Sequence, residues 1–261
     1  MEIIIRLAAS VGIFFIMICW EFLSPRRSQR INRNQRWPIN IMLGIFNMVI
    51  MRLTVGSFAY LSAVTSADNT WGLLNWLEAP EWLSIVVTLL FLDFAIYGQH
   101  IISHKWSPLW RLHQVHHTDL EFDATTAVRF HPLEIMTSMI YKVLCIFFIG
   151  ANPFGVIAFE IILNGAATFN HSNVSISSVI DHKLRWLIVT PDMHRIHHSS
   201  MPAETDCNYG FSLSCWDKLF KTYTAEPKLS QTTLSIGLEP YRQQSDLGFM
   251  SLLLLPFKKI R

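Results

Sequence analysis

The sequence predicts an all-α integral membrane protein: a bundle of about four transmembrane helices with a cytosolic helical cap. Three observations lead to this fold class. Hydrophobic residues make up 51% of the 261 residues and charged residues only 15%, which is too apolar for an ordinary soluble domain. Several apolar runs approach the ~20 residues that span a bilayer. Eleven histidines gather near the ends of these runs. We expect a single domain over residues 1–261.

The first predicted transmembrane helix covers residues 3–23, an apolar run interrupted only by Arg6. It has neither a strong basic n-region nor a small-residue cleavage site, so we expect a retained helix rather than a signal peptide. Five arginines follow between residues 26 and 36. They could form a solvated charge run, but beside two apolar spans the positive-inside rule makes this loop cytosolic. The N-terminus is then outside.

The second predicted helix covers residues 39–64, and the third covers residues 82–104. The segment 66–81 between them contains acidic residues but no Lys or Arg, so it fits an external loop with interfacial tryptophans. The third helix therefore returns the chain to the cytosol.

One face of this third helix is polar. Asp93, His100 and His104 lie on it together, because they are spaced by seven and four residues. Asp93 has two alternative roles. It orients a metal-ligating histidine from behind, or it pairs with Arg52 of the second helix.

Residues 134–170 are predicted to form a hairpin, because Asn152–Pro153 separates two apolar runs. Each run is short of a full span, so the hairpin is either two tilted helices or a re-entrant pair. A polar stripe follows the second run and ends near His171. Such a stripe usually faces a cavity or the bundle interior. Its members are Glu160, Asn164 and Thr168.

The histidines form three short motifs. HxxxH occurs once, in HIISH, and HxxHH occurs twice, in HQVHH and HRIHH. On a helix, residues three and four apart share a face, so each motif directs its imidazoles one way. Of the eleven histidines, His131 and His171 lie between the motifs, and only His182 stands outside the pattern.

Eight imidazoles facing one way are too many for a single tetrahedral zinc, so the motifs predict two metal ions close together. Nitrogen ligands of this kind suit Fe, Zn, Cu or Ni. The alternative to a metal site is that these are isolated surface or core histidines. That alternative does not explain three ordered motifs in a membrane-type chain. We expect the metal ligands to be His100, His104, His113, His116, His117, His171, His194, His197 and His198. A second set either ligates or supports the ligands: His131, Asp93, Asn170, Asn173 and Asn208.

The ordered motifs HxxxH, HxxHH and HxxHH resemble the membrane fatty acid hydroxylase and sterol desaturase superfamily, which includes alkylglycerol monooxygenase. The resemblance covers about residues 93–210 and includes RFHPLE, NHSN and NYG. It implies a non-haem di-iron site that uses O2 to hydroxylate or desaturate a C–H site of a lipid: a fatty acyl chain, a sterol or an ether lipid. The polar stripe would then line the substrate tunnel. Ile101 follows the first histidine, at a position where many members of this superfamily have a basic residue. This difference affects the expectation for the headgroup side of the substrate and not the expectation of a metal site.

Electrons are expected from a separate partner: a reductase, a ferredoxin or a cytochrome b5-type donor. The chain has no GxGxxG, no CxxCH and no ferredoxin-like cysteine set. Its net charge of +2 gives no support for nucleic-acid binding. Two other classes remain open: a membrane zinc hydrolase using the same histidines, and a metal-handling protein without turnover.

Overall fold

The computed structural model describes residues 2–54 and 57–258, and the folded part of this range is helical. Within this range, the β structure consists of isolated bridges between single residues, and no extended strand occurs. The prediction of an all-α bundle is confirmed. The long helices are α1 (Glu2–Leu23), α2 (Arg33–Thr54), α5 (Glu81–Lys105), α7 (Pro132–Ile149) and α8 (Pro153–Asn170).

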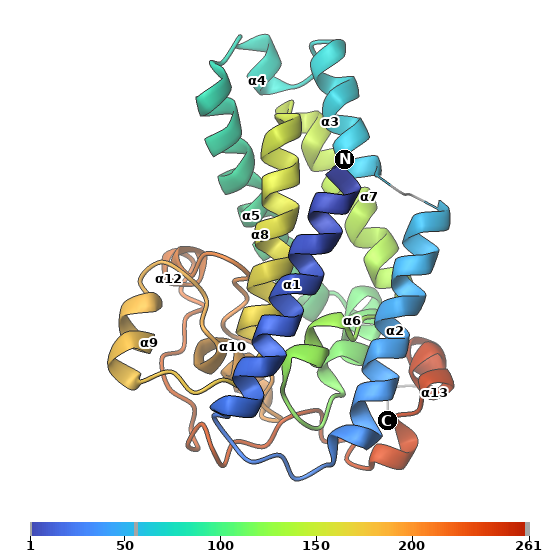
Figure 1. The fold of residues 1–261 in the computed structure, drawn as a ribbon, viewed down its shortest axis with the longest axis vertical. Coiled ribbons are helices and arrows are strands. Elements are labelled where there is room, and N and C mark those ends of the chain that lie inside the picture. The colour runs from blue at the N-terminus through green and yellow to red at the C-terminus, as the bar shows by residue number, and fades with distance from the viewer. Residues whose placement is uncertain (1, 55–56, 259–261) are drawn as a thin grey trace.

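The remaining helices are short and sit at the two ends of the bundle (Figure 1). One end carries α3 (Phe58–Asp68) and α4 (Leu73–Trp76). The opposite end carries the cap, which is made of α6 (Ser107–His117), η1 (Ala124–Val128), α9 (Ser178–Leu184), α10 (Pro191–His197), α11 (Pro202–Thr205), α12 (Cys215–Leu219), η2 (Gln244–Asp246), α13 (Phe249–Leu254) and η3 (Leu255–Phe257).

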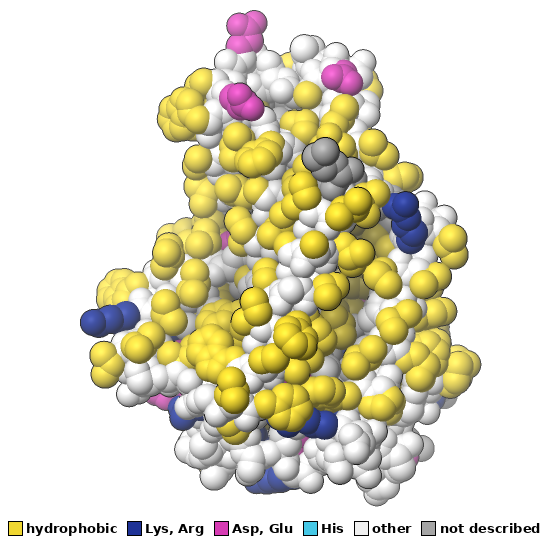
Figure 2. Space-filling view, viewed as in Figure 1, with side chains coloured by type: hydrophobic (Ala, Val, Ile, Leu, Met, Phe, Trp, Pro, Cys, Tyr) yellow, Lys and Arg dark blue, Asp and Glu magenta, His cyan; other side chains and the backbone are white. Residues whose placement is uncertain are grey.

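Within the described residues, five helical stretches are long and apolar enough to cross a membrane. They are α1, the stretch from α2 through α4, α5, α7 and α8. Their outer faces are apolar: side chains such as Phe15, Leu53 and Phe148 are each at least two-thirds exposed. Figure 2 shows this hydrophobic surface along the length of the bundle. Such a surface is stable in a lipid environment but not in water.

The second predicted span, 39–64, is wrong in its boundaries. The helix begins earlier, at Arg33, because the Asn32 side chain accepts the backbone N–H of Asn34 and so starts the first turn. It ends at Thr54, and a separate helix, α3, begins at Phe58. Residues 55 and 56 of the predicted span lie outside the described residues.

The predicted hairpin at 134–170 forms two helices of 18 residues each. Each is about 27 Å long, close to the ~30 Å of a bilayer core. Figure 1 shows α7 leaving the cap and α8 returning to it, which favours two spans over a re-entrant pair. The turn is tight because Gly150 ends α7 in the left-handed region, with φ of 70°. Gly72 approaches so closely that a Cβ on it would lie 2.1 Å from the Gly150 nitrogen.

Helices α5 and α3 hold this hairpin together. Both pack against α7 and α8, while α1 packs on α8 and α2 packs on α7 and η1. The main hydrophobic core lies where these helices meet, toward the end of the bundle opposite the cap. It contains Ala63 of α3, Leu92 of α5, Ile146 of α7 and Phe159 of α8. The cap ends of α5 and α8 are left to carry the histidines.

Candidate metal centre

Nine histidines meet at the junction of the bundle and the cap. They form two groups, and within each group the ring nitrogens that face inward lie within 4.8 Å of one another. Nearly all of these side chains are buried. The five-histidine group consists of His100, His104, His113, His117 and His197. The four-histidine group consists of His116, His171, His194 and His198.

Each HxxHH motif is divided between the two groups. His113 and His117, one helical turn apart on α6, belong to the five-histidine group, while His116 points into the other. The second motif reverses the pattern, because His197 alone joins the five-histidine group. The groups are therefore adjacent: the rings of His117 and His198, one from each, stack with centroids 4.4 Å apart. This places two metal-sized sites side by side.

Backbone carbonyls fix the orientation of three of these rings. The Nδ1–H of His100 donates to the Tyr209 carbonyl, that of His171 to Ala167 and that of His197 to Cys207, each at 2.7 Å. With the proton held on Nδ1, the lone pair on Nε2 faces the group.

The Glu134 carboxylate fixes a fourth ring, because its Oε1 lies 2.6 Å from Nδ1 of His113. Carboxylate contacts of this kind also raise the basicity of a metal-ligating imidazole. Glu134 belongs to the RFHPLE stretch, but no role was predicted for it from the sequence. Its position in the first turn after Pro132, at the start of an apolar helix, was the available signal.

The donor set fits metal ions. Both ring nitrogens of His198, and Nε2 of His104 and of His197, are buried without a hydrogen-bond partner among the described residues. An unsatisfied buried polar atom is costly, and coordination to a metal removes that cost. Burial and neighbouring histidines also lower the pKa of His198 well below its usual value and the pKa of His197 to about 3. These rings are therefore neutral, as a metal requires.

Two residues expected near the ligands have other contacts. Asp93 neither orients a histidine nor pairs with Arg52. Its carboxylate accepts hydrogen bonds from the Trp216 indole at 2.8 Å and the Leu213 backbone, and Arg52 is exposed at the end of α2. His131 lies outside both groups: it caps α7, and its Nε2 lies 3.2 Å from the Leu253 carbonyl.

The three asparagines lie beside the histidines and hold the loops that carry them. Asn170 donates to the Phe211 carbonyl. Asn173 pairs with the backbone of Arg27 in both directions. The Asn208 side chain bonds to the Met193 carbonyl, just before the last motif, while its own backbone adopts a φ of 51°. Asn170 and Asn173 thus anchor the segment that carries His171, and Asn208 holds the backbone just before His194.

The arginine loop also joins the cap. Arg36 is fully buried and contacts Asp119 at 2.6 Å and Asp123 at 2.8 Å. Arg26 pairs with Asp192, in the first turn of the helix that carries HRIHH. The Arg36 guanidinium holds the pKa of the Asp119 carboxyl below its usual range. From the sequence these arginines were predicted only to set the topology, because sequence spacing does not reveal partners 83 to 166 residues away.

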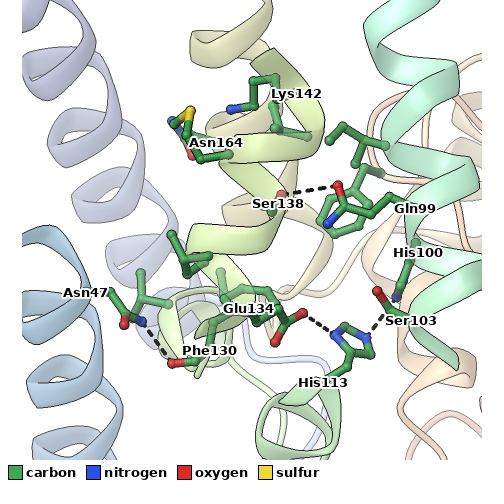
Figure 3. Close-up of a pocket in the computed structure, with 18 of the residues that line it drawn as sticks. Asn47, Gln99, His100, Ser103, His113, Phe130, Glu134, Ser138, Lys142 and Asn164 are labelled. Atoms are coloured by element: carbon green, nitrogen blue, oxygen red, sulfur yellow. Dashed lines mark hydrogen bonds and ion pairs between the residues drawn. The ribbon is translucent and has the colours of Figure 1, made fainter. Parts of the chain in front are cut away.

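A cavity of about 370 Å³ extends from the five-histidine group into the bundle (Figure 3). This volume lies in the range of small-molecule sites. His100, His113 and Glu134 line its cap end, and residues of α2, α5, α7 and α8 form its walls. Of the predicted polar stripe, Glu160 and Asn164 line the cavity. Thr168 does not, because its hydroxyl donates to the Asn164 carbonyl one turn earlier on the helix, and Ala167 takes the lining position.

Comparison with known proteins identifies the family. The sequence profile of the fatty acid hydroxylase family matches residues 85–222, which include all nine histidines. The chain belongs to the fatty acid hydroxylase family. The resemblance noted from the histidine motifs is thus confirmed. With its apolar helices, the chain is a multi-pass membrane protein.

Individual relatives are hydroxylases and monooxygenases. Ornithine lipid hydroxylase OlsE of Rhizobium tropici is 29% identical over 185 residues, covering 69% of this chain and 52% of that protein. Human alkylglycerol monooxygenase is 32% identical over 154 residues, 59% of this chain and 33% of that protein. Mouse cholesterol 25-hydroxylase is 23% identical over 165 residues, 58% and 51% respectively. The chain spans about half the length of OlsE and of the cholesterol hydroxylase, and about a third of the length of the alkylglycerol monooxygenase. No solved structure matches significantly.

Proposed function

We propose that this protein is a membrane-bound lipid hydroxylase that uses O2, external electrons and two iron ions. The observation that carries the proposal is the pair of adjacent histidine groups, of which the five-histidine group opens onto a cavity between the long apolar helices. Family membership supports an oxidoreductase, and the relatives' names support hydroxylation over desaturation.

The nine histidines are proposed as the ligands of the two ions, one ion in each group. Bound iron would supply O2 activation toward a C–H bond. The protein's own part is positioning. The carbonyls of Tyr209, Ala167 and Cys207 aim the imidazoles. The cap covers the four-histidine group completely, because all four of its rings are buried, and so keeps bulk water away.

The substrate is proposed to be a lipid that enters from the bilayer. The cavity lies between membrane helices, and its surface is mostly contributed by apolar side chains such as Ile96, Met139 and Leu163. His100 and His113 are exposed to this cavity, so a carbon held there lies next to the five-histidine group. The relatives named above act on an ornithine lipid, an alkylglycerol or a cholesterol, which supports a lipid as the class.

The electron donor is proposed to be a separate protein of the reductase, ferredoxin or cytochrome b5 type. We also infer that the cap faces the cytosol and that the N-terminus is outside. The arginine loop and all nine histidines lie at the same end of the bundle, whereas the acidic residues Asp68, Glu78 and Glu81 are exposed at the other. This distribution agrees with the positive-inside rule.

The first experiment measures metal content and O2 consumption on one preparation. The protein is purified in mild detergent from iron-supplemented cells, and O2 uptake is followed with a chemical reductant and a mixed lipid extract. We expect close to two irons per chain and reductant-dependent O2 uptake. His116→Ala should lose metal and O2 uptake together. Tightly bound zinc despite excess iron, with no O2 uptake, would instead establish the membrane zinc hydrolase.

A further inference from the structure

Two charged side chains line the end of the cavity remote from the histidines. Lys142 of α7 and Glu160 of α8 form an ion pair, with Nζ 3.0 Å from Oε1. Arg6 of α1 binds the other carboxylate oxygen. Charged groups at this depth in membrane helices are expensive, and where they occur they usually mark a functional site. An ion pair that only joined helices would be expected in a closed helix interface, but this one borders open space.

A second polar group stands at the same place. Asn164 lies one turn along α8 from Glu160, lines the cavity and is exposed. Its side-chain amide makes no hydrogen bond within the described residues. Figure 3 shows Lys142 and Asn164 together at this end, away from His113. The Lys142 ammonium has three donors, and Glu160 is its only partner in the described part of the chain.

The distance between the two ends suits an alkyl chain. Lys142 is eight residues beyond Glu134 on α7, a rise of about 12 Å along the helix. Glu134 contacts His113, so it marks the end of the cavity at the five-histidine group. Between them the walls are mainly apolar, interrupted by the hydrogen-bonded pair of Ser138 and Gln99. The cavity therefore has ionisable groups at both ends and a largely apolar wall between them.

We propose that Lys142 and Asn164 bind an anionic oxygen group of the lipid, a carboxylate or a phosphate, while its alkyl chain extends toward the histidines. The proposal rests on the proposed function and names the substrate class for it. An ammonium and an amide both donate hydrogen bonds to anionic oxygen, and such charge-assisted bonds are strong in a low-dielectric site. Glu160 keeps Lys142 pointing into the cavity. The fixed distance then selects which carbon lies at the five-histidine group.

The test measures lipid binding by the full chain, without metal or turnover. The purified protein is placed in phosphatidylcholine nanodiscs, and the binding of radiolabelled palmitate, 1-palmitoyl lysophosphatidate and hexadecanol is compared. We expect at least one anion to bind more tightly than the alcohol. Lys142→Met should weaken that binding about tenfold, the size of a lost charge-assisted hydrogen bond, and leave hexadecanol within about twofold. The anion that binds more tightly identifies the source of the group.

Three variants separate recognition from folding. Lys142→Arg keeps the charge and should retain anion binding. Asn164→Leu should weaken it with the ion pair intact. Lys183→Met removes an exposed lysine of α9 as a matched control and should change nothing. Anion binding unchanged in Lys142→Met, or no tighter than alcohol binding in the wild type, would overturn the proposal. Lysine-dependent binding without O2 uptake would overturn only the oxygenase.

Discussion

At the scale of single residues, the candidate metal centre depends on groups that contact the ring nitrogens facing away from the proposed metal ions. Glu134 is an example, since one carboxylate oxygen holds His113 while the other is buried without a partner in the described residues. The same side chain lines the cavity. It therefore fixes a ring of the five-histidine group at the point where substrate would approach.

Removing the Glu134 carboxylate should weaken metal binding. In Glu134→Ala the His113 ring loses its orienting contact, and loss of such contacts typically lowers metal affinity about 10- to 100-fold. Iron titration against a competing chelator measures the change. Glu239→Ala removes an exposed carboxylate and serves as the control. Equal affinities in the two variants would mean that Glu134 does not position the ligand.

At the scale of elements, a buried polar network joins α2 to the segment between the first HxxHH motif and α7. Besides its contacts with Arg36, the Asp119 carboxylate accepts hydrogen bonds from Asn40 and Thr126. Arg129 donates to Asn40 and to the Thr118 hydroxyl. Buried charges are tolerated only when they are fully paired, so this network fixes one position of α2 against the cap.

Breaking this network should destabilise the protein strongly. Arg36→Met leaves two buried carboxylates without their cation, which typically costs about 3–5 kcal/mol. Arg30→Met, six residues earlier, removes an exposed guanidinium and should change stability by less than about 0.5 kcal/mol. Denaturant unfolding of both variants in the same detergent checks the difference. Similar midpoints would show that the network contributes little.

At the scale of the whole molecule, the two ends differ in charge. On the face drawn in Figure 2, acidic but no basic side chains gather at the α3–α4 end, and basic groups cluster near the cap. The arginines of the loop do more than set orientation, because Arg26 and Arg36 are already paired with cap carboxylates. The charge bias from which we infer a cytosolic cap thus belongs to the same contacts that close the site.

The proposed topology predicts opposite labelling of two loops. In a Cys215→Ser background, which removes the exposed native cysteine, Asn69→Cys reports on the α3–α4 end and Ser28→Cys on the arginine loop. A membrane-impermeant maleimide should label Asn69→Cys in intact cells and Ser28→Cys only after permeabilisation. The reverse pattern would place the histidines outside.

Much of the bundle was predictable because its signals are local. Apolar runs marked α1, α5 and the α7–α8 hairpin, and three- and four-residue spacings marked the histidine motifs. The second span was placed wrongly because its start depends on the Asn32 side chain and not on hydropathy. Thr168 was misplaced in the tunnel for a related reason: on an apolar helix, a threonine can bond to the preceding turn instead of facing a cavity.

The division of the histidines into two groups was not predictable from spacing. A helix shows that His113, His116 and His117 share a face, but which of them meets His197 depends on how α6 and α10 cross. The partner of Asp93 was equally hidden, because Trp216 lies 123 residues further along the chain. Contacts between residues so far apart in the sequence can be identified only in the folded structure.

Because the two histidine groups share both HxxHH motifs, both groups are completed late in the synthesis of the chain. Each group draws on both HxxHH motifs, so the five-histidine group is complete only once His197 has been made and the four-histidine group only once His198 has been made. At about 5–20 residues per second, His198 follows His100 by on the order of 5–20 s. During that interval the early motif exists in an unfinished chain with no closed pocket. The proposed metal ions can therefore bind only after the helices that surround the cavity have been synthesised.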